Sequence, residues 1–222
     1  ANPMSERSAA IFLEFESREM ASRALTVKLA ELLGGALESR GKAALVVSGG
    51  TSPVALFHHL REEPLDWRNI TIVASDERRV APDHADRNEA MIRHELMQGA
   101  AAEAQLVSLI PPGEIPGRFD AVVLGMGGDG HTASLFPGSP DLDRALTSTN
   151  PLESVQVPQL GSERVSMTPG TLLNSEAVYL LFFGAEKRAV YEAAVAGDDV
   201  HEYPVRVVLN QDIAPVAVFW AP

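Results

Sequence analysis

Short, almost continuous apolar runs alternate along this chain with stretches whose apolar residues recur at helical spacing. Strands that are apolar on both faces belong to parallel sheets covered by helices on both sides. The pattern therefore predicts an α/β fold, a mostly parallel sheet with helices on both faces in a Rossmann-like three-layer sandwich. The 222 residues fit one domain over positions 1–222. The predicted strands are 43–48, 69–75, 120–125, 177–184 and 215–220, and the predicted helices are 18–40, 53–62, 88–97 and 185–196.

Three polar or glycine-rich segments directly follow predicted strands, at residues 48–51, 76–79 and 125–131. In open α/β sheets, ligands bind beyond the carboxyl ends of the strands. The sequence therefore predicts that these three segments carry the chemistry and meet at one edge of the sheet.

The stretch SGGTSP joins a predicted strand to a predicted helix through Ser48, Gly49, Gly50, Thr51 and Ser52. Inward-facing amides beside glycines, together with a helix N-terminus, form a pocket for an anion, typically a phosphate. A tight turn with Thr51 or Ser52 as the helix N-cap explains the same residues. Both interpretations stay open, and the Walker pattern is absent because no lysine follows the glycines at the required place.

The stretch SDERRV places two carboxylates and two guanidinium groups in one predicted loop. Arg78 is suited to clamp a phosphate or a carboxylate, and Asp76 or Glu77 to orient it or to transfer a proton. A solvated loop whose charges neutralise one another is the alternative.

The stretch GMGGDGHTASLFP, residues 125–137, combines glycines, an acid and an imidazole at the end of a predicted strand. His131 is the candidate general base, because histidine titrates near neutral pH. Asp129 is the candidate group that orients it. Backbone amides of the loop Gly125–Gly130, which includes Gly127 and Gly128 as candidate substrate-binding residues, are expected to stabilise developing negative charge, helped by an arginine. The alternative is a glycine-rich turn in which Asp129 caps a helix.

The formal net charge of −12 argues against a nucleic-acid partner or an anionic membrane surface. An anionic small molecule would need a local cluster of basic side chains. Arg164, in a strand-like run, and Lys187, just after Gly184, are candidate anion contacts that could join Arg78, although singly each is more often a surface charge.

Several classes of function lack their sequence signals. Cysteine is absent, which excludes disulfides and thiolate chemistry. The other five histidines show no metal-ligand spacing, so no metal is expected. No apolar run is long enough to span a membrane, and the first residues show no signal-peptide pattern. The absence of cysteine makes the cytoplasm the expected location.

The segments SGGTSP, SDERRV, DRNEAM, GMGGDGHTASLFPGSP, ERVSMTPGTLLN and FFGAEK resemble, in order and approximate spacing, those of the bacterial-type 6-phosphogluconolactonases. The resemblance implies hydrolysis of 6-phospho-D-glucono-1,5-lactone without a metal or organic cofactor. It implies that His131 is the base, that Arg78, Arg164 and Lys187 line the substrate pocket, and that the turn 48–52 lies on the phosphate side.

This sequence departs from the family pattern in three places. Arg87-Asn88 stands where serine-asparagine is usual, Ser166 stands where threonine is usual, and VFWAP lacks a common aspartate. These departures concern pocket geometry more than the class of reaction.

Two other functions remain as alternatives. An aminosugar-phosphate isomerase or deaminase of the same fold also carries a Gly-Asp-Gly-His loop, but its loop continues differently from Thr132 to Pro137 here. A sugar-phosphate sensor would be expected to carry a DNA-binding segment, for which the N-terminal part offers no room. A monomer or a small homo-oligomer is expected.

Overall fold

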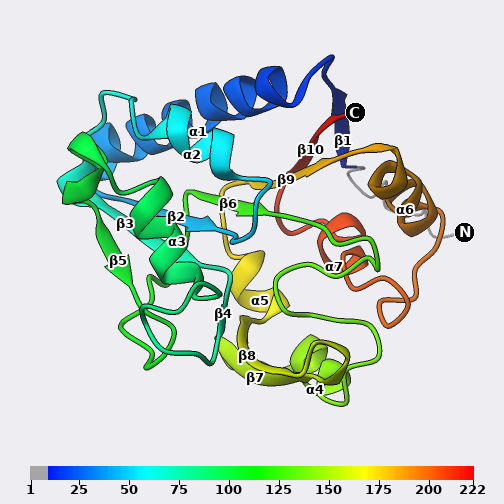
Figure 1. The fold of residues 1–222 in the computed structure, drawn as a ribbon. Helices are drawn as coiled ribbons and strands as arrows, with labels where there is room; N and C mark the ends of the chain where they lie inside the picture. The colour runs from blue at the N-terminus through cyan, green and yellow to red at the C-terminus, as the bar shows by residue number, and fades with distance from the viewer. Residues whose placement is uncertain (1–9) are drawn as a thin grey trace, which may run out of the picture.

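The computed structural model describes residues 10–222, so the segment searched for a signal-peptide pattern lies mostly outside the described residues. Its main feature is a seven-stranded sheet in the order β1-β10-β9-β6-β2-β3-β5, in which every neighbouring pair is parallel (Figure 1). This confirms the predicted parallel sheet. The strands are β1 (Ile11–Glu14), β2 (Ala43–Val47), β3 (Ile70–Ala74), β5 (Gln105–Val107), β6 (Ala121–Leu124), β9 (Val178–Phe183) and β10 (Val216–Ala221).

The chain leaves β2 in one direction and later returns to its other side. It first builds β3 and β5, then comes back to β6, which pairs with β2 through Leu45–Ala121 and Val46–Val122. Neighbouring strands whose connections run in opposite directions leave a crevice beyond their carboxyl ends. The segments that follow β2 and β6 therefore border one crevice.

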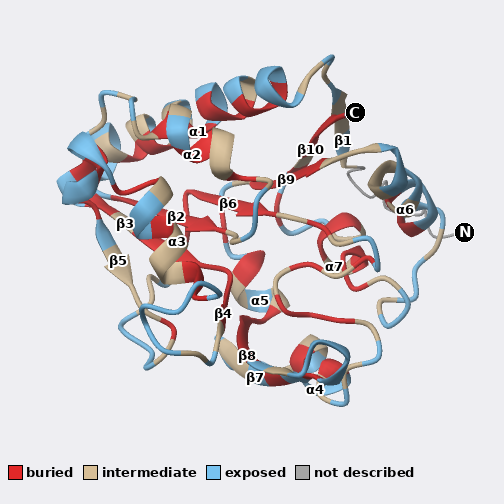
Figure 2. Cartoon of the chain, in the orientation of Figure 1, coloured by how far each residue is buried: buried red, intermediate tan, exposed pale blue. Residues whose placement is uncertain are grey.

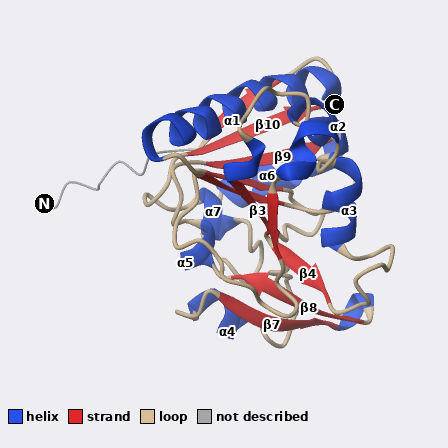
Figure 3. Cartoon of the chain, turned by 90° about the vertical axis from the view of Figure 1, so that its left-hand side faces the viewer, coloured by secondary structure: helices blue, strands red, loops and turns tan. Residues whose placement is uncertain are grey.

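Helices cover both faces of this sheet, as predicted. The long helix α1 and helix α2 lie on one face, and α5 and α7 lie on the other (Figures 1 and 3). Helix α1 begins where the Ser17 hydroxyl accepts a hydrogen bond from the Met20 amide and ends at Gly41, whose φ of 74° suits glycine. The helices are α1 (Arg18–Arg40), α2 (Val54–Leu60), α3 (Asn88–Glu95), α4 (Leu142–Thr147), α5 (Pro169–Leu172), α6 (Ala185–Val195) and α7 (Arg206–Leu209).

Burial explains which strands can be predicted. Every residue of β2 and β6 is buried, so these strands show as continuous apolar runs (Figure 2). The edge strands β1 and β5 contain exposed and half-buried residues and are only four and three residues long. Both are absent from the predicted strands: β5 gives no such run, and the short apolar run that opens β1 is not among the predicted ones.

A second, antiparallel sheet is also absent from the prediction. It has the order β4-β8-β7, with β4 at Asp76–Arg78, β7 at Leu152–Val157 and β8 at Ser162–Met167. The prediction of a loop at SDERRV is therefore wrong for Asp76–Arg78, because this segment pairs with β8. A short polar segment can form a strand when a distant strand supplies its hydrogen-bond partners. The alternation of polar and apolar residues within the segment does not reveal that partner.

Glu77 ties this small sheet to helix α3. Its buried carboxylate accepts hydrogen bonds from the amides of Arg78, Asn88 and Glu89 at 2.7–2.9 Å, and it lies 3.4 Å from the Arg87 guanidinium. Burial raises the pKa of Glu77, and the amide hydrogen bonds and Arg87 offset part of that rise. Glu77 thereby supplies acceptors to the first turn of α3, where backbone amides have no helical partner.

We expect Glu77→Gln to lower the free energy of unfolding by about 2–4 kcal/mol. Each carboxylate oxygen faces a backbone N–H donor, so either orientation of the amide sets its NH₂ group against a donor. The substitution also removes one of the two carboxylates that pair with Arg87, the other being Glu89. Urea unfolding monitored by circular dichroism measures this change. Glu163→Gln is the control, because Glu163 only forms an exposed pair with Arg79 and should cost less than about 1 kcal/mol. Equal effects of the two substitutions would contradict this account.

Candidate active site

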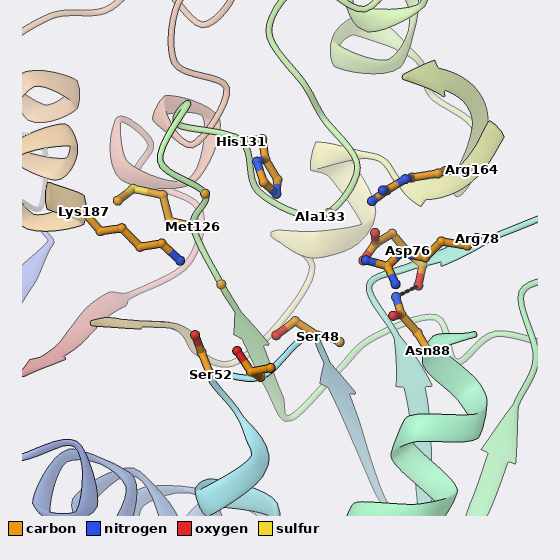
Figure 4. A pocket seen from close by; sticks show the side chains of 15 residues that line it. Ser48, Ser52, Asp76, Arg78, Asn88, Met126, His131, Ala133, Arg164 and Lys187 are labelled. Carbon is orange, nitrogen blue, oxygen red and sulfur yellow. Dashed lines mark hydrogen bonds between the residues drawn. The ribbon is translucent and has the colours of Figure 1, made fainter. Parts of the chain in front are cut away.

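A cavity of about 260 Å³ opens beyond the carboxyl ends of β2, β3, β6 and β9, over the crevice between β2 and β6 (Figure 4). Its walls come from the three predicted segments, from β8 and from the first turn of α6. It is lined by Ser48, Gly49, Gly50, Thr51, Ser52, Asp76, Arg78, Asn88, Gly125, Met126, Gly127, His131, Ala133, Arg164 and Lys187.

The structure brings most of the predicted site residues together. Among them, Gly128 and Asp129 do not line the cavity: Gly128 is exposed, and Asp129 contacts the cavity residue His131. Four lining residues were not predicted individually, namely Asn88, Gly125, Met126 and Ala133. Three of these lie within the glycine-rich motif, where they could have been included. Asn88 opens a predicted helix, and the residue type alone gave no signal.

The imidazole of His131 is held by the carboxylate of Asp129. Its Nδ1 lies 2.5 Å from Asp129 Oδ1, and the His131 amide donates to the same oxygen at 3.0 Å. Burial on its own would raise the pKa of Asp129, but the hydrogen bonds and charge of His131 outweigh it, so the pKa lies below its usual range. An ionised carboxylate only accepts, so the proton sits on Nδ1 and the Nε2 lone pair is free. Within residues 10–222, Nε2 has no hydrogen-bond partner.

The glycine at position 127 makes room for the imidazole. A Cβ atom there would lie 2.1 Å from both His131 Cε1 and His131 Nδ1. Its amide donates to the His131 carbonyl at 2.9 Å, and the Gly130 amide donates to the Gly127 carbonyl. These two amides are thus already used within the loop, which corrects the expectation that the loop as a whole offers its amides to a ligand. Of the described loop residues that line the cavity, Gly125 and Met126 have amides without a protein acceptor.

The turn after β2 presents a run of unsatisfied backbone donors. The amides of residues 49–52 have no acceptor in the described part of the chain. Gly49 packs against Asn88, since a Cβ there would lie 2.1 Å from Asn88 Oδ1. The interpretation of Thr51 or Ser52 as an N-cap is wrong, because Pro53 occupies that position and no side chain caps the helix. The turn therefore retains donors for an anion.

Arg78, Arg164 and Lys187 converge on the cavity from three elements. Arg78 and Arg164 are cross-strand partners in β4 and β8, while Lys187 lies in the first turn of α6 (Figure 4). Within residues 10–222, none of the three has a carboxylate oxygen within 4.0 Å. Burial lowers the pKa of Arg164, and the neighbouring charge of Arg78 lowers it further. Two neighbouring, unpaired arginines with a lysine across the cavity form a site for an anion (Figure 4).

Asp76 serves as an anchor beneath these cations. Its buried carboxylate accepts hydrogen bonds from the hydroxyls of Ser75 at 2.8 Å and Ser134 at 2.5 Å. The Ser134 amide in turn donates to the Ser166 hydroxyl at 3.1 Å. Asp76 thus fastens the loop that carries His131 to the small sheet.

Two of the departures from the family pattern, Arg87 and Ser166, lie outside the cavity lining. Arg87 points away from the cavity and donates to the carbonyls of Val80 and Ile110. Ser166 is buried beside Ser134. No set of three or more acidic or histidine side chains among residues 10–222 is placed to hold a metal ion. No helix in this range is long and apolar enough to cross a membrane.

Comparison with known proteins places the chain among enzymes that act on sugar phosphates. Residues 16–116 and 99–220 match the family described as glucosamine-6-phosphate isomerases/6-phosphogluconolactonase. The 6-phosphogluconolactonase of Pseudomonas aeruginosa is 39% identical over 90% of both chains, and that of Neisseria meningitidis is 35% identical over 95% of this chain and 99% of its own. A crystal structure of a 6-phosphogluconolactonase from Shewanella baltica superposes with a TM-score of 0.93 at 36% identity, covering 96% of this chain and 98% of the other.

The chain belongs to the glucosamine-6-phosphate isomerase/6-phosphogluconolactonase family. Within that family it is an enzyme of the 6-phosphogluconolactonase group. A monomeric glucosamine-6-phosphate deaminase shares the fold with a TM-score of 0.75, at only 18% identity.

We expect Gly127→Ala to displace the His131 ring, because the added Cβ cannot coexist with the imidazole. Gly128→Ala is the matched control, since a Cβ at that position meets nothing within 4 Å. The ¹H–¹⁵N resonances of the imidazole nitrogens, assigned by difference from His131→Ala, measure the displacement. Gly127→Ala should shift them and Gly128→Ala should not. An unchanged His131 signal in Gly127→Ala would show that the ring is not packed as described.

Proposed function

We propose that the protein hydrolyses 6-phospho-D-glucono-1,5-lactone to 6-phospho-D-gluconate, as a step of the oxidative pentose phosphate pathway and without a metal or organic cofactor. One observation carries the proposal. A histidine whose Nδ1 is held by an ionised carboxylate shares a cavity with three cations that have no carboxylate partner among the described residues. This combination suits ester hydrolysis of an anionic substrate, because it offers a proton acceptor and an anion site together.

His131 acts as the general base in this mechanism. Nε2 takes a proton from a water molecule as that water attacks the lactone carbonyl carbon. The Asp129 carboxylate keeps Nδ1 protonated and stabilises the imidazolium that forms. When the tetrahedral intermediate collapses, the bond to the ring oxygen breaks and the imidazolium returns the proton to that oxygen, which gives the open-chain acid.

Negative charge on the former carbonyl oxygen needs hydrogen-bond donors within reach of that oxygen. The free amides of Gly125 and Met126 supply candidates at the end of β6, and a guanidinium group can assist. The side chains of residues 125–128 are small except at Met126, which lets the substrate approach the backbone closely.

The phosphate of the substrate binds among the unpaired cations and the free amides of the turn 48–52. These groups are donors only, so they favour a dianion over a neutral sugar hydroxyl. The phosphate does not change charge during lactone opening, and its contacts should contribute equally to substrate binding and to transition-state binding.

The first test is His131→Ala, which should lower kcat by about 10²-fold or more, because a positioned base typically contributes about 10²- to 10⁴-fold. Lactone hydrolysis is measured above the spontaneous background, together with ammonia release from glucosamine 6-phosphate. Activity of the variant near that of the unsubstituted protein would overturn the mechanism, and ammonia release without lactone hydrolysis would overturn the substrate.

The same mechanism fixes the direction of the pH dependence. Because the pKa of Asp129 lies below its usual range, this carboxylate stays ionised as the pH falls through the range in which imidazoles titrate, between about pH 8 and 5. kcat/KM should therefore decline on the acid side as the imidazole takes up a proton, rather than as Asp129 does. Asp129→Asn should reduce kcat at least about tenfold but less than His131→Ala does, because a misoriented base is still present. A flat acid limb down to about pH 4 would point to a carboxylate base instead.

Neutralising a phosphate contact should affect binding more than turnover. We expect Arg164→Met to raise KM about 10- to 100-fold with a smaller change in kcat, since a hydrogen bond to a charged group contributes about 1.5–3 kcal/mol. It should not lower the free energy of unfolding by much, because it removes a desolvated charge that repels Arg78. Arg79→Met is the control, since Arg79 pairs with Glu163 outside the cavity. A lower kcat with unchanged KM would instead show that Arg164 stabilises the transition state and does not bind the phosphate.

A further inference from the structure

One aromatic ring contacts both the candidate base and a candidate anion-binding group. The Phe136 ring stacks on the His131 imidazole with centroids 4.0 Å apart and an interplanar angle of 20°. The guanidinium carbon of Arg164 lies 5.1 Å from the centre of the same ring. Phe136 is itself only 3% exposed and does not line the cavity, so it supports these two groups without facing the substrate.

The chain bends sharply to bring Phe136 under a residue only five positions earlier. The Leu135 amide donates to the Thr132 carbonyl, which closes a turn, and Ala133 within it has a φ of 49°. A non-glycine residue in this left-handed region is unfavourable and persists only when its surroundings hold it. Here the hydroxyl of Ser134, the next residue, is bonded to the buried Asp76.

We infer that Phe136 is a positioning residue, whose ring sets the orientation of the His131 imidazole and holds Arg164 at a fixed place relative to it. The inference rests on the proposed function, in which His131 is the base and Arg164 binds the anion. The hydrogen bond from Nδ1 to Asp129 still lets the imidazole tilt about it, and a flat ring stacked on its face removes that freedom. An aliphatic side chain of similar size fills the space but offers no flat face.

The ring also has an electrostatic effect, because an aromatic face attracts cations. It favours the imidazolium formed after proton abstraction, as it favours the guanidinium of Arg164. The charged groups around His131 are Asp129 at Nδ1, Arg164 over the same ring, and Arg78 and Lys187 on the cavity walls. Of these groups, only Asp129 and the aromatic face stabilise the protonated imidazole.

The test is Phe136→Leu, compared with Phe119→Leu. Phe119 is 1% exposed and precedes β6, at the amino end of that strand, so its substitution controls for loss of a buried aromatic ring. We expect Phe136→Leu to lower kcat about tenfold, to raise KM severalfold, and to move the acid limb of kcat/KM to lower pH by about half a unit. Phe119→Leu should lower thermal stability without moving the acid limb or KM.

Phe136→Tyr keeps the aromatic face and should retain the acid limb and KM of the unsubstituted protein. If Phe136→Leu does not fold, Phe136→Met, with its flexible side chain, replaces it in the same measurements. An unchanged acid limb and KM in a folded variant without the ring overturns the inference. Its failure is distinct from failure of the proposed function, which is judged by His131→Ala. An active His131→Ala overturns both, whereas an inactive His131→Ala with a normal Phe136→Leu overturns only the role of Phe136.

Discussion

The parallel pairing of β2 with β6 is the constraint on which the site depends. The chain builds outward from β2 on one side and from β6 on the other, so the connections that leave these neighbours diverge. The divergence leaves space at the carboxyl ends of the two strands. The segments that follow them lie close together, since a Cβ on Gly125 would lie 3.9 Å from the Ser48 hydroxyl. The donor-rich turn 48–52 and the loop with His131 therefore face one cavity as a result of topology.

Two successive carboxylates in β4 connect this topology to the chemistry. Side chains alternate along a strand, so neighbours point to opposite faces. Asp76 bonds to Ser134 and so fixes the loop with the imidazole, while Glu77 bonds to the first turn of α3 and so fixes Asn88. Asn88 in turn donates to the Asp76 carbonyl and packs on Gly49. Buried carboxylates are costly unless fully bonded, and these two are bonded to the groups that shape the cavity walls.

The parts of the molecule that could be predicted from the sequence are those encoded locally. Continuous apolar runs identify the central strands, and the rule for carboxyl ends places residues 48–51, 76–79 and 125–131 at one edge of the sheet. The small antiparallel sheet could not be predicted in this way, because Arg78 and Arg164 become neighbours only through the pairing of two strands that are distant in the sequence. The roles of Asn88 and Phe136 were missed for a related reason. Each acts through a contact with a distant or folded-back partner, which residue type does not reveal.

The candidate base with its carboxylate and the two anion-binding arginines differ in how far apart the members of each pair lie along the chain. The base and the carboxylate that orients it are two residues apart, within a loop at the end of a fully buried strand. The two arginines are joined only by the pairing of β4 with β8, in a small sheet whose outer strand β7 carries exposed residues. Segments with fewer buried contacts open at lower free energy than the core. Because Asp76 fastens the loop with His131 to this same sheet, loosening of the sheet by mild denaturant should disturb the two arginines and the placement of the imidazole together. The contact between Asp129 and His131 lies within one loop and does not depend on the sheet.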